Sequence, residues 1–107
     1  MAVRSTEELK DIVKRYYHIL LREGFPVEKV LLFGSFTRNR QRENSDIDLA
    51  VVLSKFSTDR FNTRLELMKF ARDFDEVIEP HPFLSSEFDE SDPFVSEILK
   101  TGEIIYS

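Results

Sequence analysis

The sequence predicts an α/β (α+β) domain: a small mixed β-sheet flanked by helices, spanning residues 1–107 as one unit. Its length of 107 residues is that of one ordinary domain, and ten Phe with many aliphatic residues supply one core. Stretches with helical spacing of apolar residues alternate with short apolar runs typical of buried strands. No repeat, low-complexity tract or Gly/Ser linker marks an internal boundary.

The first half of the chain predicts a helix, a strand and a short helical segment. Ser5 and Glu8 form a capping-box pattern, and Gly24 ends the helix. The apolar run 29–33 predicts a buried strand, and 35–42 predicts one or two helical turns. One face of the first helix is expected to enter the core, and its members are Leu9, Ile12, Val13, Tyr16 and Leu20.

The second half predicts two more helices and three strands. Residues 46–53 predict a central strand, and 76–79 a short one that ends where Pro80-His81-Pro82 begins. A helix over 58–74, begun near Thr58 or Asp59, is expected to bury a stripe. That stripe consists of Phe61, Leu65, Met68 and Ala71. Finally, Pro93 begins a helix through Lys100, Gly102 lies past its end, and 103–106 predict an edge strand.

Composition excludes several classes of function. Without Cys there is no disulfide, thiolate zinc site or thiol nucleophile. No apolar run approaches the length of a membrane span and the N-terminus has no signal-peptide pattern, so we expect a cytoplasmic protein. The net charge of −5 argues against broad nucleic-acid binding. The basic run 38–42 leaves room for a small anion, although composition alone favours a solvated loop.

Two carboxylates open the predicted central strand. Asp46 and Asp48 are two positions apart in the predicted strand, so both side chains project to the same side. Converging carboxylates repel unless a cation lies between them, and hard oxygen ligands suit Mg²⁺. Such a pair is often found on a surface strand, exposed to solvent and without a function. Here, however, the pair lies at the start of a strand that is otherwise apolar.

Gly34 and Ser35 join the first predicted strand to the helical segment. Backbone N–H groups and a hydroxyl at such a junction can hold a phosphate, although a tight turn with an N-cap explains them as well. Taken with the paired carboxylates and a ten-residue gap, these residues resemble the signature of the polymerase-β-like nucleotidyltransferases. The flanking segments 31–38 and 44–51 are similar to the minimal nucleotidyltransferases of bacteria and archaea.

The resemblance implies a polymerase-β-like nucleotidyltransferase fold and a set of roles. Gly34 and Ser35 would hold the β- and γ-phosphates of a nucleoside triphosphate, and Asp46 and Asp48 would ligate two Mg²⁺ ions. A third carboxylate on a neighbouring strand would act on the incoming hydroxyl. Two arginines, Arg38 and Arg42, are placed to contact the triphosphate, although exposed helix arginines explain them equally well.

The third carboxylate has four candidates, which are Asp73, Asp75, Glu76 and Glu79. We predict Glu79, because the following proline holds it in extended geometry and because Ile78 would face the other side of the sheet. The family more often has Asp at this point.

The resemblance also implies ATP as the donor and a small helical, HEPN-like partner protein as the acceptor, as in toxin–antitoxin pairs. The alternative is a non-catalytic, antitoxin-like module that keeps the fold to bind a partner. A small-molecule nucleotidyltransferase of the antibiotic-modifying type fits less well, because the chain has no residues left for an acceptor-binding domain.

The two histidines and the phenylalanines are not expected to form a functional site. His18 is expected on the polar edge of the first helix, and His81 in a loop without a role. The Phe residues are expected as core or loop anchors and not as a base-stacking platform. They are Phe56, Phe61, Phe70, Phe74, Phe83, Phe88 and Phe94.

Overall fold

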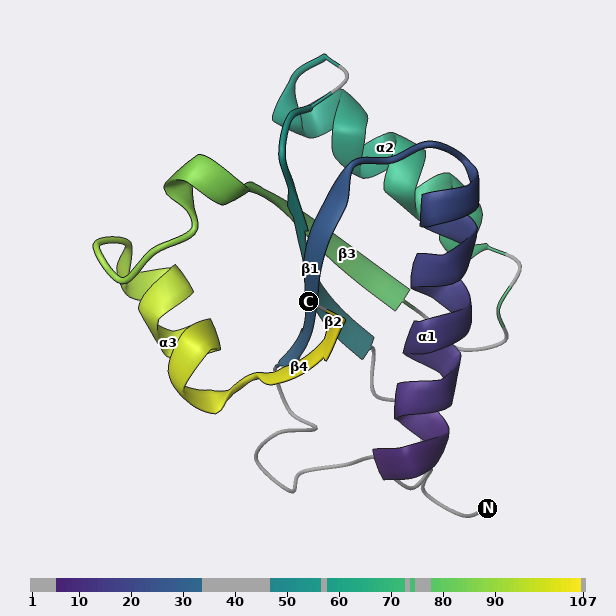
Figure 1. Cartoon of the computed structure of the whole chain (residues 1–107), viewed down its shortest axis with the longest axis horizontal. Helices are drawn as coiled ribbons and strands as arrows, with labels where there is room; N and C mark the ends of the chain where they lie inside the picture. The colour runs from purple at the N-terminus through teal and green to yellow at the C-terminus, as the bar shows by residue number, and fades with distance from the viewer. Residues whose placement is uncertain (1–5, 34–46, 57, 73, 75–77, 107) are drawn as a thin grey trace.

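The computed structural model describes residues 6–33, 47–56, 58–72, 74 and 78–106. Figure 1 shows its helices and strands in chain order. They are α1 (Thr6–Arg22), β1 (Val27–Phe33), β2 (Ile47–Leu53), α2 (Arg60–Ala71), β3 (Ile78–Leu84), the 3-10 turn η2 (Ser85–Glu87), α3 (Pro93–Thr101) and β4 (Glu103–Tyr106). The predicted Ser5 cap and the helical turns over 35–42 lie outside the described residues.

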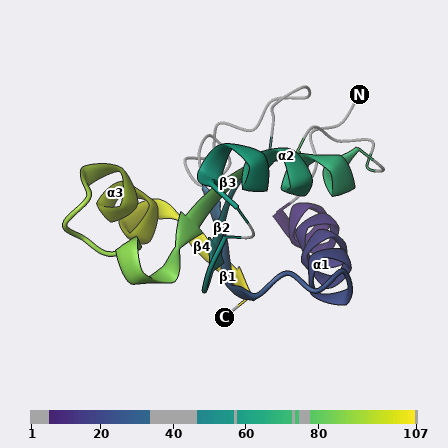
Figure 2. The same cartoon turned by 90° about the horizontal axis from the view of Figure 1, so that it is seen from above.

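The four strands form one mixed sheet in the order β3-β2-β1-β4. β1 pairs antiparallel with β2 and with β4, whereas β2 and β3 run parallel. The two longer helices, α1 and α2, pack on one face of the sheet, and α3 packs on the other (Figure 2). The predicted α+β architecture with a small mixed sheet is therefore confirmed.

Each face of the sheet carries its own hydrophobic cluster. The predicted core face of α1 is buried throughout, and it packs with Leu67 and Ala71 of α2. Tyr16 joins the two helices, because its buried hydroxyl donates a 2.7 Å hydrogen bond to the carbonyl of Leu67. Burial raises the pKa of Tyr16 above its ordinary value. On the opposite face, Val95 and Ile98 of α3 pack against the sheet.

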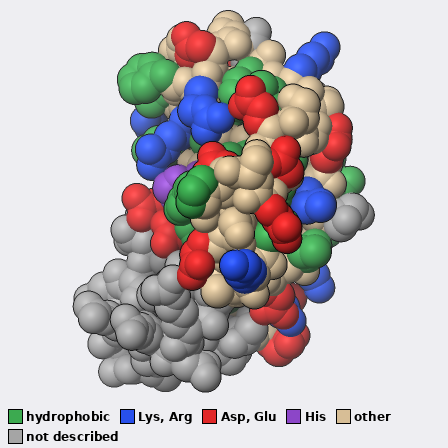
Figure 3. Space-filling model, turned by 90° about the vertical axis from the view of Figure 1, so that its left-hand side faces the viewer, with side chains coloured by type: hydrophobic (Ala, Val, Ile, Leu, Met, Phe, Trp, Pro, Cys, Tyr) green, Lys and Arg blue, Asp and Glu red, His purple; other side chains and the backbone are tan. Residues whose placement is uncertain are grey.

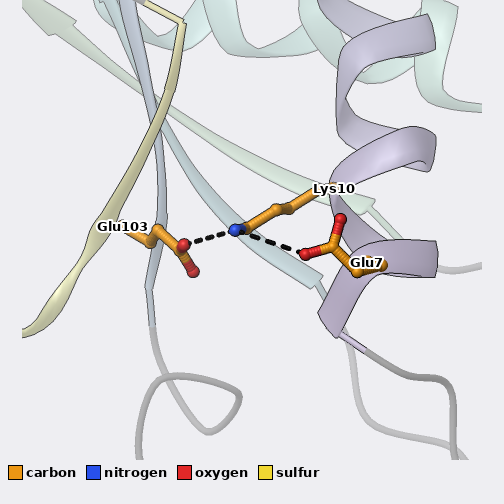
Figure 4. A network of polar contacts seen from close by, with 3 residues as sticks. All are labelled: Glu7, Lys10 and Glu103. Atoms are coloured by element: carbon orange, nitrogen blue, oxygen red, sulfur yellow. Dashed lines mark ion pairs between the residues drawn. The ribbon is translucent and has the colours of Figure 1, made fainter.

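Ion pairs connect the first turns of α1 to the edge strand β4. The Nζ atom of Lys10 lies 2.6 Å from Oε1 of Glu103 and 3.8 Å from Oε1 of Glu7 (Figure 4). The hydrogen bond to Glu103 is the main cause of a raised pKa for Lys10. Because Glu7 is exposed and the other two groups are only half-buried, we expect the ion pairs to orient α1 more than to stabilise it.

The predicted apolar stripe of α2 is wrong for three of its four members. Ala71 is buried, whereas Phe61, Leu65 and Met68 have exposed fractions of 70%, 49% and 38%. Leu67 and Thr63 face the core instead. Apolar residues lie on both sides of this helix, so their spacing alone did not indicate which side is buried. The helix is also shorter than predicted, and Asp59 caps it by accepting from the backbone N–H of Asn62 at 2.8 Å.

The third strand extends further than predicted, since it is described over Ile78–Leu84, and residues 76 and 77 of the predicted strand lie outside the described residues. Pro80 and Pro82 were expected to follow the strand, but both lie inside β3. This is possible because β3 is an edge strand, where a residue without an N–H can face the open side. The carbonyl of Pro82 does face a group outside the sheet, since it accepts a 3.0 Å hydrogen bond from Nη1 of Arg60.

Candidate active site

Three strand ends meet at one end of the sheet. The last residue of β1, Phe33, is the register partner of Asp48 near the start of β2. On the other side of β2, Asp48 is the register partner of Glu79, the second residue of β3. Two carboxylates that are 31 positions apart in the sequence therefore become direct neighbours across a parallel strand pair.

The carboxylates share the face of the sheet that α3 covers. Ile47 and Ile78, which precede them, belong to the cluster under α1 and α2. Because side chains alternate along a strand, Asp48 and Glu79 lie on the opposite face. Adjacent strands are about 4.8 Å apart, which brings the two half-buried carboxylates side by side. This confirms the prediction that Ile78 and Glu79 face opposite sides.

His81 is a neighbour that the sequence analysis missed. Its Nε2 lies 3.3 Å from Oδ1 of Asp48, and its ring packs at 5.4 Å from the ring of Phe33. About seven-tenths of each side chain is buried, with exposed fractions of 28% for His81 and 29% for Asp48. The expectation of a loop histidine was wrong because the strand continues through both prolines. The signal was its position two residues after Glu79, which places both on one face once the strand is extended.

The other predicted site residues lie outside the described part of the chain. These are Gly34, Ser35, Arg38, Arg42 and Asp46, together with the rival third carboxylates Asp73, Asp75 and Glu76. Of the predicted set, the structure thus brings together Asp48 and Glu79. Within the described ranges no group of three or more acidic, His or Cys side chains could hold a metal ion.

The donor set at this end of the sheet suits a hard divalent cation. Carboxylate oxygens are hard ligands, and Mg²⁺ binds through one or two of them while water and phosphate oxygens complete its coordination. Asp48 and Glu79 supply two such groups on neighbouring strands. A divalent cation between them would also relieve the repulsion of two adjacent negative charges.

Known proteins share both the sequence pattern and the fold. The sequence model of the family described as Polymerase beta, Nucleotidyltransferase matches residues 7–107. A Methanocaldococcus jannaschii protein described as "Putative protein adenylyltransferase MJ1379" is 32% identical over 68 residues, which is 64% of this chain and 67% of that protein. A second protein of that organism with the same description, MJ0128, is 41% identical over 49 residues, 46% of this chain and 49% of its own length.

Solved structures agree in fold at lower sequence identity. A chain from a toxin–antitoxin crystal structure with AMP-PNP superposes with a TM-score of 0.65 at 22% identity, covering 92% of this chain and 73% of that one. A chain from a complex of tri-AMPylated Shewanella oneidensis HEPN toxin with MNT antitoxin gives a TM-score of 0.60 at 21% identity, covering 92% and 72%.

The fold and the matched family define the class of protein, which is a nucleotidyltransferase. More specifically, the chain belongs to the polymerase beta nucleotidyltransferase family, whose model spans nearly all of it. In the described part of the chain, no helix is both long and apolar enough to cross a bilayer.

Proposed function

We propose that this chain transfers AMP from ATP to a hydroxyl group of a partner protein in a Mg²⁺-dependent reaction. The observation that carries the proposal is the pairing of Asp48 with Glu79 on one face of the sheet. Adjacent carboxylates repel each other, so keeping them together at a strand end has a cost that metal binding offsets. Membership of the nucleotidyltransferase family supports the same reaction class.

We assign the reaction to residues on the three strand ends. Asp46, Asp48 and Glu79 hold the ions, and Gly34 and Ser35 bind the β- and γ-phosphates, with Arg38 and Arg42 beside them. When bound, Mg²⁺ polarises the phosphoryl oxygens and neutralises the charge that develops on pyrophosphate. Glu79, on β3 and so separated from β1 by β2, orients the incoming hydroxyl and accepts its proton.

The proposed acceptor is a small, helical, HEPN-like protein. Two relatives are described as protein adenylyltransferases, and one structural neighbour comes from a complex with an AMPylated HEPN toxin. We place the reaction in the cytoplasm, where ATP and Mg²⁺ are available.

The second candidate function is a non-catalytic module that binds and neutralises the same partner. In this alternative, the chain neutralises the partner by binding it through its surface, and no nucleotide is transferred. The exposed apolar side chains of α2 give this alternative a physical basis, because Phe61, Leu65 and Met68 could contact a partner without any reaction.

Label transfer from α-labelled nucleotides distinguishes the two functions. The chain is incubated with Mg²⁺, its candidate partner and each of the four triphosphates in turn, and labelled protein is separated by gel electrophoresis. We expect label from ATP on the partner, and at least a hundredfold less with Asp48→Asn. Glu90→Gln is the matched control, because it removes an exposed acid outside the site. Neutralisation of the partner by Asp48→Asn, with no label from wild type, would establish the binding module instead.

A further inference from the structure

His81 contacts one of the two paired carboxylates, and the function proposed above gives it no role. Its Nε2 lies 3.3 Å from Oδ1 of Asp48, and both side chains are largely buried. It follows Glu79 by two positions in β3, so both project to the face of the sheet that α3 covers, as Phe83 does. Figure 3 shows this side of the molecule: basic and hydrophobic side chains gather next to a histidine, and acidic side chains follow beyond it.

The small residue opposite His81 gives its ring room to reach Asp48. In the register of β2 and β3, Asp48 pairs with Glu79, and Ala50 pairs with His81. Ala50 is fully buried and presents only a methyl group, so the imidazole can lean along β2 toward Asp48. The contact is therefore diagonal across the strand pair, and it adds to the direct pairing of the two carboxylates.

Aromatic packing fixes the imidazole in this position. The ring of Phe33, from the strand on the other side of β2, lies 5.4 Å from the ring of His81. Phe33 packs in turn edge-on against Phe94 of α3, at a centroid distance of 5.8 Å. Close packing of this kind leaves His81 little freedom to turn away from Asp48.

Two prolines stiffen the strand that carries His81. Pro80 and Pro82 lie on either side of it in β3, and the ring of each proline fixes its own φ angle. The residue before a proline is restricted to extended geometry, and here this applies to both Glu79 and His81. The proposed third carboxylate and the histidine are therefore held on one stiff segment of backbone.

The contact between His81 and Asp48 has one hydrogen-bond direction. An ionised carboxylate only accepts, so Nε2 of His81 donates and Oδ1 of Asp48 accepts. In the part of the chain that the structure describes, no three acidic, His or Cys side chains are grouped so that they could hold an ion. The geometry therefore relates His81 to Asp48 as its hydrogen-bond donor and not to an ion as a further ligand.

A carboxylate with one oxygen engaged discriminates between divalent cations. Mg²⁺ is small and demands a nearly ideal octahedron, which the narrow bite of a bidentate carboxylate distorts. Ca²⁺ is larger, takes more ligands and accepts carboxylates through both oxygens. Because the hydrogen bond from His81 engages Oδ1, Asp48 is left to bind an ion through Oδ2. Such a ligand meets the needs of Mg²⁺ and denies Ca²⁺ its bidentate contact.

We propose that His81 is a positioning residue that makes Asp48 a single-oxygen ligand and so favours Mg²⁺ over Ca²⁺. This inference rests on the proposed function, because that reaction needs the ion. In this role His81 acts through Asp48 and contacts neither the nucleotide nor the acceptor. Hydrogen bonds to metal ligands orient those ligands, and their removal costs about 10–100-fold in metal affinity.

Metal affinity measured without any reaction tests this role. Mg²⁺ and Ca²⁺ are titrated separately into the full chain, and each Kd is obtained from the amide NMR signals at the start of β2. His81→Phe keeps an aromatic ring and removes the donor, so we expect the Kd for Mg²⁺ to rise about tenfold or more and the Kd for Ca²⁺ to change less than about threefold. His81→Gln restores an N–H donor and should return the Kd for Mg²⁺ to within about threefold of wild type.

His18→Phe is the matched control for the titrations. It removes the other histidine, which is exposed on α1 with its ring stacked on Tyr17, and it should leave both Kd values unchanged. Equal losses of affinity for the two ions in His81→Phe, or no recovery in His81→Gln, would overturn the inference.

The donated hydrogen can be observed in wild type, which makes the test independent of how well the variants fold. Long-range proton–nitrogen NMR spectra of the imidazole report which ring nitrogen carries a hydrogen. We expect a hydrogen on Nε2 of His81 without metal and also with saturating Mg²⁺. Its absence in the metal-free chain contradicts donation to Asp48, and its loss on addition of Mg²⁺ makes His81 itself a ligand. Either result overturns the positioning role.

Label transfer distinguishes failure of this inference from failure of the proposed function. In His81→Phe the Mg²⁺ concentration that gives the half-maximal rate should rise about tenfold, whereas KM for ATP at saturating Mg²⁺ should not change. An unchanged Mg²⁺ requirement with label transfer intact contradicts the role of His81 and leaves the proposed function standing. A complete absence of label with wild type contradicts the proposed function and this inference with it.

Discussion

Replacing Asp48 by Asn should change stability and metal response in opposite directions. Asp48 and Glu79 are register partners on adjacent strands, about 4.8 Å apart. Two unit charges at this distance repel by about 1 kcal/mol with the dielectric constant of water and by about 3 kcal/mol with a value of 20. Since an asparagine side chain would keep an oxygen for the contact with His81, the substitution chiefly removes the repulsion.

The predicted magnitudes are measurable by thermal unfolding. Without Mg²⁺, a gain near the lower value of 1 kcal/mol raises Tm by about 4 °C in a domain of this size. In wild type, Mg²⁺ at ten times its Kd adds RT ln 11, or about 1.4 kcal/mol, which raises Tm by about 6 °C. The variant should lack this second increase.

Differential scanning fluorimetry with and without Mg²⁺ separates the two effects, and Glu90→Gln again serves as the control. A lower Tm for metal-free Asp48→Asn would refute the idea that the two carboxylates oppose each other. An undiminished response to Mg²⁺ would show that the ion binds elsewhere.

Four further predictions concern the scaffold. Tyr16→Phe should lower the free energy of unfolding by about 1–2 kcal/mol in urea titrations, because it deletes the buried hydrogen bond to the carbonyl of Leu67; no change would mean that the bond adds nothing. Leu67→Ala should cost about 3–5 kcal/mol, since the side chain is fully buried; a loss below 1 kcal/mol would contradict the packing between α1 and α2. Gly102→Ala should cost about 1–3 kcal/mol by the same measurement, because a Cβ there lies 2.5 Å from the carbonyl oxygen of Ile98, and a neutral result would refute this close approach. Because burial raises the pKa of Tyr16 in the folded chain, stability should fall above pH 10 more steeply in wild type than in Tyr16→Phe, and parallel pH profiles would contradict that burial.

Elements with local signals could be predicted from the sequence. The core face of α1 followed from its spacing, and the start of α3 followed from Pro93, which is its first residue as expected, directly after the N-cap Asp92. The pairing partner of Asp48 also had a local signal, because Pro80 fixes extended geometry on Glu79.

The features that could not be predicted from the sequence depend on tertiary contacts. The buried side of α2 is determined by Tyr16 and the rest of α1, so the helix exposes three of the four residues of the apolar stripe that its own sequence favoured. The full length of β3 depends on its place at the sheet edge, which tolerates both prolines. The contact of His81 with Asp48 could be recognised only once β3 was known to extend through both prolines.

The central claim is that Asp48 and Glu79 together hold a divalent metal ion. Mn²⁺ is a paramagnetic substitute for Mg²⁺, and it broadens the NMR signals of nearby nuclei. At substoichiometric Mn²⁺ we predict selective broadening of amides at the starts of β2 and β3, reversed by excess Mg²⁺ and absent in Asp48→Asn. Broadening centred instead on the exposed acids between η2 and α3, which include Asp89 and Glu90, would contradict the claim.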